Sequence, residues 1–408
     1  MKVRQSSPPH GKLTVTLIAG SAAHQKSLAD FLAREDILRR AVRLSPDLDI
    51  LEPNSAGDLK LIRRFASYRV VNRSLWAIWR RLPWVKRQAP SPVIALSSAV
   101  DKIISRWLPP TRIFHGVSGV CLASIRRARR LGAITLIENG TLHPVAWQLE
   151  VLADCATGGL PAKQCERVIP PMQMRRRERE YETCNKILVY SSAAWRSFQP
   201  FPYAHKAVVV HPGIDHRLFS PSRNTCREPI FRVCYVGRIE AAKGLLFLVE
   251  AWKRLALDHA ELVLAGRVLP ELADTFTKGL PVGIRLAGIL TSEEVANLHR
   301  ESDVFVFPSM NEGLSLALLE AMSSGLAVIA CSGTGAEDCI TAGKEGLLVL
   351  GRKADAIAGA IQWFYDHPDE RRAMGAAARM RIEEHFTISH YQRRIMELYQ
   401  SLVAGTPP

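Results

Sequence analysis

The sequence predicts an α/β protein with two domains, each built around a parallel sheet. Short apolar runs of strand character alternate with helix-like segments along the whole chain of 408 residues, and this alternation is typical of βα units with parallel sheets. A chain of this length can bury two ample cores. Residues 211–222 read HPGIDHRLFSPS, and a polar stretch follows them. Since Pro, Gly and Asp favour turns, we expect an interdomain linker there.

The first domain, residues 1–212, is expected to contain six strands. The first of them, Leu13–Ala19, is followed by Gly20-Ser21 and by a helical pattern from Leu28 to Leu38. This order favours a buried strand over a secretory signal, which the start of the chain superficially resembles. The other runs of strand character are Val93–Leu96, Arg112–His115, Ala133–Glu138, Lys186–Tyr190 and Ala207–His211.

The second domain, residues 225–386, is expected to contain six more strands. Its apolar runs are Phe231–Val236, Glu261–Ala265, Ile284–Ala287, Val304–Phe307, Ala327–Ala330 and Gly346–Val349. In the final segment, residues 387–408, apolar residues recur at helical spacing over Ile388–Leu402, so we expect an amphipathic helix there.

The composition, 47% hydrophobic and 23% charged residues, fits a soluble globular enzyme. No apolar run approaches the roughly 18–20 residues that a membrane-spanning helix needs. The eight cysteines are scattered without a C-x-x-C pair, so the sequence indicates neither a zinc site nor a disulfide framework. A reducing cytoplasm is the simplest location for such a chain.

The net charge of +15 is unevenly distributed. Residues 1–225 hold 35 Lys and Arg against 16 Asp and Glu, and the rest holds 19 against 23, so the first half is expected to meet an anionic partner. Leu59–Val100 contains no acidic residue and mixes nine cations with five aromatic residues. This mixture suits an anionic membrane interface, or equally a solvated helix face with its aromatic residues in the core. Further basic runs follow at Arg126–Arg130 and Arg175–Arg179.

The segment Phe305–Ile329, FVFPSMNEGLSLALLEAMSSGLAVI, predicts a sugar-nucleotide site. An apolar strand leads to a turn ending at Glu312-Gly313, and a helix begins at about Leu314. Glycine lets the backbone approach a ligand, and the N–H groups of a new helix point at an anion. Glu312 suits hydroxyls rather than phosphate, and Glu320, among apolar residues, needs hydrogen bonds such as a ribose diol provides. The alternative is that Glu312 is a loop charge and Glu320 a surface position on an amphipathic helix. That interpretation would not explain the strand, the glycine and the apolar helix together.

A second motif, VGRIEAAKG at 236–244, also follows a strand and opens a helix. Arg238 and Lys243 can clamp a diphosphate there, the arginine by paired hydrogen bonds and the lysine as a point charge. Cations at this place would also stabilise charge on a departing nucleoside diphosphate. Gly237 belongs to this loop, and Gly266 in Ala265-Gly266-Arg267 gives a weaker signal of the same kind.

Together these motifs resemble the signature of the retaining glycosyltransferases of family four, which have the GT-B fold of two Rossmann-like domains facing a cleft. The resemblance covers most of residues 111–402, including Pro212–Asp215 with Phe219 at the linker. It implies that Glu312 contacts hydroxyls of the donor sugar and Glu320 holds the ribose. It also implies that the main chain at Gly313, Leu314 and Ser315 binds the diphosphate, and that the C-terminal helix crosses back to the first domain.

The acceptor side of the site is less well defined in the sequence. Many family members place a histidine after the fourth strand of the first domain, where this chain reads LIENGTLHP. His143 resembles a variant of that pattern and is our candidate for contact with the transferred sugar, with Asn139 and His115 as alternatives. The family's paired glycines near the N-terminus are reduced to the single Gly20, a candidate for donor binding.

The resemblance implies a metal-independent transferase, without a cofactor, that moves a sugar with retention from a nucleotide-diphosphate sugar to an acceptor hydroxyl. No D-x-D pattern is present that would hold a divalent metal on the diphosphate. The acceptor is expected to be a glycan or a lipid-linked molecule of bacterial surface glycan or glycolipid synthesis. An alternative is a sugar-nucleotide epimerase of related fold. A nucleic-acid-binding protein is suggested by charge alone and has no recognised module in the chain.

Overall fold

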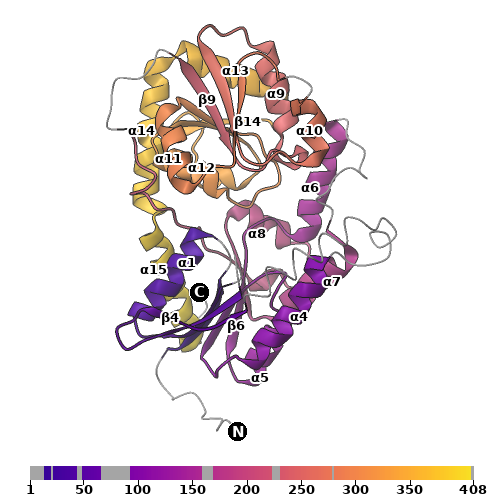
Figure 1. The fold of residues 1–408 in the computed structure, drawn as a ribbon, viewed down its shortest axis with the longest axis vertical. Helices are drawn as coiled ribbons and strands as arrows, with labels where there is room; N and C mark the ends of the chain where they lie inside the picture. Colours follow the sequence, from indigo (N-terminus) through magenta and orange to yellow (C-terminus); the bar gives the residue numbers. More distant parts are fainter. Residues whose placement is uncertain are drawn as a thin grey trace.

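The computed structural model describes residues 13–19, 22–43, 48–65, 92–158, 169–222, 230–277 and 280–405. The chain folds into two lobes, each with a central sheet covered by helices (Figure 1). The predicted α/β class with two sheet domains is confirmed.

The sheet of the first lobe has the strand order β4-β3-β2-β1-β5-β6-β7-β8. The pairs formed by β1, β2 and β5 to β8 are parallel, whereas β3 pairs antiparallel with both β2 and β4. The sheet is therefore mixed, and the sequence prediction missed β2, β3 and β4. The strands are β1 (Val15–Ala19), β2 (Leu38–Arg43), β3 (Leu48–Pro53), β4 (Leu59–Phe65), β5 (Ile113–Val117), β6 (Ile134–Asn139), β7 (Lys186–Val189) and β8 (Ala207–Val209).

The β3–β4 hairpin is formed by a turn that the sequence does signal. The Asn54 side chain accepts hydrogen bonds from the backbone N–H groups of Ala56 and Asp58, and Gly57 has a φ of 83°. Asn and Gly are the residues that favour such a turn. The strands on either side carry charged residues at several positions, so they lack the continuous apolar run of the strands that were predicted.

Two predictions for the first lobe were wrong at the level of element type. Val93–Leu96 lies in α4, because a short apolar run does not distinguish a strand from part of a helix. The helical pattern assigned to Leu28–Leu38 ends at Arg34, and Leu38 begins β2. The helices here are α1 (Ala23–Arg34), α4 (Pro92–Arg106), α5 (Leu122–Arg130), α6 (Pro144–Thr157), α7 (Pro171–Thr183), α8 (Ser192–Phe198) and the short 3-10 helix η2 (Ala204–Lys206).

The sheet of the second lobe is parallel throughout, with the order β11-β10-β9-β12-β13-β14. All six strands predicted for this part of the chain are present, with ends that differ by at most one residue. Strands β12 and β13 are buried on both faces, as expected for central strands of a parallel sheet. The strands are β9 (Phe231–Val236), β10 (Ala260–Ala265), β11 (Ile284–Gly288), β12 (Val304–Phe307), β13 (Ala327–Cys331) and β14 (Gly346–Val349).

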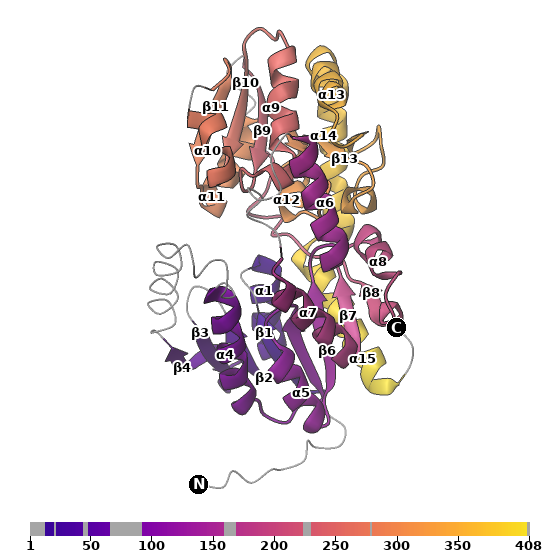
Figure 2. The same ribbon diagram turned by 90° about the vertical axis from the view of Figure 1, so that its right-hand side faces the viewer.

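Helices cover both faces of this sheet and lead back to the first lobe (Figure 2). They are η3 (Ala241–Lys243), α9 (Leu245–Arg254), α10 (Pro270–Thr277), α11 (Ser292–Glu301), α12 (Leu316–Ser323), η4 (Gly335–Asp338), α13 (Ala354–Asp366), α14 (Pro368–His385) and α15 (Ile388–Ala404).

The last helix, α15, packs on the first lobe, as the resemblance implied (Figure 1). Its buried face, which includes Ile395 and Leu398, joins the core cluster formed by β1 and α1. The hydroxyl of Tyr391 donates to Glu138 Oε1 at 3.1 Å, and the hydroxyl of Tyr399 lies 2.7 Å from Nδ1 of His115. The N-terminal side of the chain thus depends on its C-terminal helix for part of its core.

The chain crosses between the lobes twice, and the two crossings lie side by side. The N–H of Ile214 donates to Phe386 O, and the N–H of Ile388 donates back to Ile214 O. A Cβ on Gly213 would lie 2.6 Å from the Thr387 carbonyl oxygen, so this close approach requires glycine.

None of the helices formed by the described residues is both long and apolar enough to cross a membrane. Five buried cysteines, at 121, 184, 234, 331 and 339, keep free thiols, whereas Cys155 of α6 is disulfide-bonded. The cysteine spacing gave no sign of this bond. The cytoplasmic location, which rested partly on the cysteine pattern, stays a prediction.

Candidate active site

The candidate site lies where loops at the carboxyl ends of the strands of both sheets meet. Thr141, in the loop after β6, forms an isolated antiparallel bridge with Glu312, in the loop after β12. Ser191, after β7, donates its hydroxyl to the Gly313 carbonyl oxygen at 2.6 Å. Ligands of open parallel sheets bind at this edge, so the position agrees with that predicted for Glu312 and Gly313.

Two of the predicted catalytic residues form an ion pair. Lys243, at the end of η3, contacts the carboxylate of Glu312, although 69 residues separate them in the chain. Their side chains are 13% and 16% exposed, so the pair is neither sealed in the core nor in bulk water. The ammonium also lies 5.9 Å from the ring centroid of Phe307. An anion that approached Lys243 would compete with Glu312 for it.

Arg238 lies in the loop after β9 and is half exposed. Its Nε is 3.3 Å from Oε1 of the buried Glu240, and its carbonyl oxygen accepts a hydrogen bond from Tyr235 at 2.9 Å. The carboxylate of Glu240 therefore holds one edge of the guanidinium group, while the side chain as a whole remains about half exposed.

Gly237 and Gly266, predicted to bind the donor, bring two loops into contact. A Cβ on Gly266 would overlap the Gly237 carbonyl oxygen, so no larger residue fits there. Together with Arg238 and Arg267 these glycines line a cavity of about 240 Å³, whose other walls include the apolar side chains of Ile289, Leu290 and Val295. The cavity combines two cations with an apolar wall.

The helix α12 begins at Leu316, two residues later than expected, with Ser315 as its N-cap; the Ser315 hydroxyl accepts from Leu318 N at 3.4 Å. Gly313 has a role that the sequence did not show. A Cβ there would lie 2.8 Å from the Gly140 carbonyl oxygen of the first lobe. The glycine thus allows the two lobes to close, in addition to any approach of a ligand.

Glu320 projects from the middle of α12 and is partly buried. Burial raises the pKa of its carboxyl group from 4.5 to about 7. Among the described residues no side chain or backbone group hydrogen-bonds or ion-pairs with this carboxylate. A buried carboxylate without a partner costs free energy, and a ligand with hydroxyl donors would remove that cost.

His143, the predicted contact for the transferred sugar, occupies a structural position. It is fully buried as the N-cap of α6, where Nδ1 accepts from Val145 N at 3.2 Å and Nε2 lies 2.8 Å from the Tyr203 hydroxyl. Its ring stacks on Phe201 with centroids 3.5 Å apart. Burial lowers the pKa of His143 to about 4. Contact with a sugar would require this histidine to leave both hydrogen bonds.

The two alternatives to His143 are also buried and engaged. The amide of Asn139 donates to Thr141 O at 2.7 Å and accepts from the Tyr181 hydroxyl at 2.9 Å. His115 is held by Tyr399 of α15. Gly20 lies outside the described residues, as does most of the basic and aromatic stretch 59–100.

A group of residues that sequence reasoning missed joins the lobes beside Glu312. On α6, Asp154 is buried, and its Oδ1 accepts from Nε of Arg352 at 2.7 Å while its Oδ2 accepts from Nδ2 of Asn311 at 3.2 Å. Glu150 Oε2 accepts from the same arginine at 2.5 Å. Asn311 also donates to the Ala242 carbonyl oxygen. Asp154 of the first lobe thus holds the residues just before Glu312 and Lys243. We call Asp154, Arg352 and Asn311 the α6 clasp.

A second set of contacts joins the lobes near the linker. Asp338 of η4 accepts from Ser192 N at 2.7 Å, and its Oδ2 lies 2.9 Å from Nε2 of His211. The sequence offered no signal for either set, since the partners in the two lobes are more than 120 residues apart.

The α6 clasp gives a testable prediction. Asp154→Ala is expected to lower kcat/KM about tenfold, because Asn311 loses its contact to α6 and Arg352 loses a buried carboxylate. Residues in one network couple by about 0.5–3 kcal/mol, so Asp154→Ala and Arg352→Ala should be strongly non-additive in a double-mutant cycle. Asp355→Ala is a matched control, because Asp355 is 86% exposed and pairs with Arg254 on the surface. Additive effects on kcat/KM would contradict this role for the clasp.

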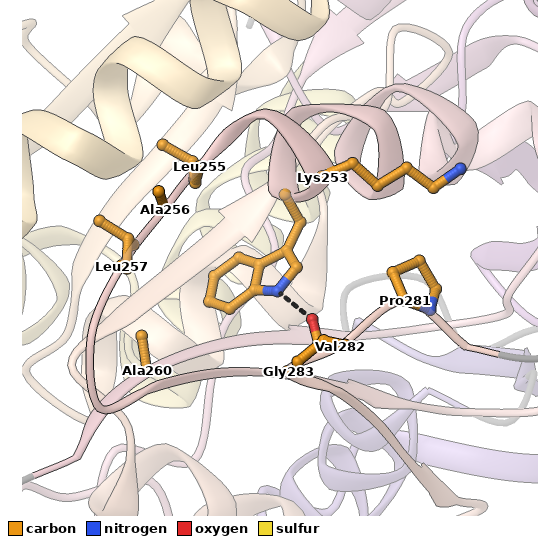
Figure 3. Close-up of a pocket in the computed structure, with 9 residues that line it drawn as sticks. Lys253, Leu255, Ala256, Leu257, Ala260, Pro281, Val282 and Gly283 are labelled. Atoms are coloured by element: carbon orange, nitrogen blue, oxygen red, sulfur yellow. Dashed lines mark hydrogen bonds between the residues drawn. The ribbon is translucent and has the colours of Figure 1, made fainter.

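A second pocket, of about 350 Å³, lies where α9 ends and β10 and β11 begin (Figure 3). It surrounds Trp252, whose indole N–H donates to the Val282 carbonyl oxygen at 3.3 Å. Among the described residues of its lining, Lys253 is the one that carries a charge. A pocket without converging polar groups, remote from the loops above, is a weaker candidate for chemistry. No group of three or more potential metal ligands occurs among the described residues.

Residues 230–367 match the family model described as Glycosyl transferases group 1. The D-inositol 3-phosphate glycosyltransferase of Corynebacterium urealyticum is 28% identical over 225 residues, which are 49% of this chain and 52% of the relative. The alpha-maltose-1-phosphate synthase of Mycolicibacterium smegmatis is 30% identical over 207 residues, 47% of this chain and 53% of the relative. The matched region thus spans about half the length of these curated relatives.

Solved structures of low sequence identity share the fold. The sucrose-phosphate synthase of Thermosynechococcus elongatus superposes with a TM-score of 0.67 at 18% identity, covering 97% of this chain and 100% of that one. HepE of Anabaena, solved in complex with UDP and glucose, gives 0.65 at 13% identity, covering 96% and 100%. Residues 230–367 are therefore a group 1 glycosyl transferase domain, set in a chain with the GT-B fold.

Proposed function

We propose that this protein is a glycosyltransferase that moves a sugar, with retention of configuration, from a nucleoside-diphosphate sugar to an acceptor hydroxyl. The observation that carries the proposal is the arrangement of carboxylates and cations around α12. Glu320 is partly buried and has no partner among the described residues, and Glu312 is held by Lys243 at the edge of the sheet. Hydroxyl groups and a diphosphate are the ligands that would satisfy these groups together.

The roles of the residues follow from their surroundings. The diphosphate would lie at the N-terminus of α12, where the first backbone N–H groups of the helix have no partner within it. Lys243 would then move from Glu312 toward the phosphates, and Glu312 would be free to accept hydrogen bonds from sugar hydroxyls. The ribose would bind Glu320. Lys243 and Arg238 would stabilise the charge that develops on the departing nucleoside diphosphate.

The cavity beside Arg238 is the proposed site of the base. Its apolar wall at Ile289 and Leu290 suits one face of a flat ring, and its two arginines suit the carbonyl groups at the edge of a base. The similarity to HepE, solved in complex with UDP and glucose, supports a nucleotide-sugar donor.

The domain boundaries predicted from the sequence form part of the proposal. Residues 1–212 would bind the acceptor and residues 225–386 the donor, with 387–408 returning to the first domain. The names of the relatives refer to phosphorylated small molecules, inositol phosphate and maltose 1-phosphate. The charge excess of the first half favours an acceptor with anionic groups, such as a lipid-linked glycan of the cell surface. No observation favours the epimerase alternative.

A thermal-shift experiment tests the donor assignment. UDP, GDP, ADP and CMP are added separately to the protein without metal, and one of the diphosphates is expected to raise the melting temperature. A ligand at about a hundred times its Kd stabilises the folded state by about 2.7 kcal/mol. The sugar nucleotide of that base is then offered with and without an acceptor. If no nucleotide shifted the transition, the proposed donor site would be refuted. Conversion of the donor sugar without any acceptor would instead identify an epimerase.

A further inference from the structure

A cationic groove lies on the outer surface of the first lobe, away from the candidate active site. It is a cavity of about 370 Å³ between α4, α5 and α7, helices that lie against one another on one side of the sheet (Figure 2). Its lining includes Lys102 from α4, Arg126 from α5, and Arg175, Arg176 and Arg179 from α7. The function proposed above does not use these residues.

Four of these five cations are exposed and have no anionic partner in the part of the chain that the structure describes. The side chains of Lys102, Arg126, Arg175 and Arg179 form no ion pair with any carboxylate of the described residues, and all four line the same cavity. Like charges brought together on and between helices repel one another. A fold that gathers them around a concave surface therefore presents a site at which an anion lowers the free energy.

The acidic groups at the floor of the groove do not neutralise the four exposed cations. Asp101 is buried and accepts hydrogen bonds from Ala123 N at 2.6 Å, Ser124 N at 3.0 Å and the Ser124 hydroxyl at 2.7 Å. It also accepts from Nη2 of the buried Arg176 at 3.0 Å. Glu180, below it, accepts from Gly119 N and Cys121 N. Both carboxylates are thus committed to the start of α5, the loop before it and Arg176.

Exposed apolar side chains accompany the cations. Met172, on the lining of the groove, is 54% exposed, whereas Ile103 and Trp107, which are 37% and 39% exposed at the end of α4, lie outside this lining. A surface that mixes exposed aliphatic and tryptophan side chains with cations is typical of a lipid interface. A solvated ionic surface would have no need of these apolar groups.

We propose that the α4–α5–α7 groove binds the phosphate-bearing headgroup of an anionic lipid, with the exposed Met172 beside the upper part of the acyl chains. The volume of the groove suits a single headgroup rather than a strand of nucleic acid. Binding there would hold the first lobe, and hence the proposed acceptor side, at a membrane surface. The proposal does not depend on transferase chemistry and can be tested without a donor.

The test is co-sedimentation of the full chain with vesicles of phosphatidylcholine, alone or mixed with phosphatidylglycerol, at low salt. The groove variant is Arg175→Gln with Arg179→Gln. Each cation near an anionic membrane contributes about 1 kcal/mol, so the two changes should weaken binding to the anionic vesicles about 30-fold. The matched control, Arg34→Gln with Arg393→Gln, removes the same charge from exposed positions on α1 and α15 and should bind like wild type. A second groove variant, Lys102→Gln with Arg126→Gln, changes the opposite wall, so misfolding of one variant does not decide the result.

Three outcomes would overturn the proposal. The first is equal binding of groove and control variants to the anionic vesicles. The second is that inorganic pyrophosphate stabilises the wild type, but not the groove variants, against thermal unfolding, while all of them bind vesicles equally. That result would assign the groove to a soluble phosphate. The third is loss of single-stranded RNA retention in the groove variants with unchanged vesicle binding, which would assign it to nucleic acid.

Discussion

Replacing Glu320 by alanine is expected to abolish sugar transfer and to weaken nucleoside diphosphate binding about 100-fold, with the fold intact. The carboxylate is the group on α12 that would accept the ribose hydroxyls, and losing hydrogen bonds to a charged acceptor costs about 3 kcal/mol. Isothermal titration with the nucleotide identified by the thermal shift measures the loss. Glu397→Ala, which removes an exposed carboxylate from α15, is the matched control and should bind the nucleotide like wild type. Unchanged nucleotide affinity in Glu320→Ala would refute the ribose role.

The carboxylate of Glu320, which is expected to favour nucleotide binding, should lower the stability of the folded protein when no nucleotide is bound. Because burial raises the pKa of Glu320 from 4.5 to about 7, the folded protein binds more protons at this site than the unfolded chain between these values. Its contribution to stability therefore falls as the pH rises through that window, and the cost is fully present above about pH 7. Without nucleotide, Glu320→Gln should be at least as stable as wild type at about pH 8, with a smaller difference at about pH 5. A variant that was less stable than wild type at the higher pH would show that Glu320 has a structural partner.

Lys243→Ala is expected to lower kcat about 100-fold or more, with a smaller effect on donor affinity. The ammonium would neutralise charge that appears on the leaving diphosphate only as the glycosidic bond breaks, and removing one such group typically costs two to three orders of magnitude, about 3–4 kcal/mol. Arg238→Ala should act in the same direction. Lys253→Ala is the matched control, since Lys253 is 51% exposed on α9 and lines the remote pocket. If Lys243→Ala turned over the donor as fast as Lys253→Ala, the leaving-group role would be lost.

The Lys243–Glu312 pair allows a further distinction. Lys243→Ala removes the cation and leaves Glu312, whereas Glu312→Gln removes the carboxylate and leaves Lys243 free for the phosphates. Loss of Glu312 should therefore reduce turnover while preserving or increasing affinity for the nucleoside diphosphate itself. Equal loss of nucleotide affinity in both variants would indicate that the pair acts only as a structural contact.

The second lobe could be predicted closely from the sequence, and the first lobe only in outline. Strands such as β12 and β13 are buried on both faces, so their apolar runs are continuous and easily recognised. Strands β2 to β4 lie at the edge of their sheet, where β4 exposes Leu61 and Ile62 and carries Lys60 between apolar residues. Composition alone does not distinguish such segments from helix or loop. The same limit explains why part of α4 was interpreted as a strand.

The residues of the candidate site also divide into those that local motifs predict and those that depend on how the lobes pack. Glu312, Lys243, Arg238 and Glu320 lie in local motifs, each a strand, a turn and a helix start, and the sequence placed them in such elements. His143 was chosen by its position after β6, but the sequence could not show that Phe201 and Tyr203 surround it. The contacts of Asp154 with Arg352 and Asn311 depend on how the lobes pack, and no local pattern encodes that.

The paired crossings at Ile214 and Ile388 restrict how the substrates can enter. Two backbone segments that hydrogen-bond to each other join the lobes on the side of the molecule along which α14 and α15 lie (Figure 1). Helix α6, which carries Asp154, lies on the opposite side (Figure 1), so separation of the lobes there would break the contacts of Asp154 with Arg352 and Asn311. Donor and acceptor would then enter from the same side, and each turnover would require the contacts of Asp154 with Arg352 and Asn311 to break and form again.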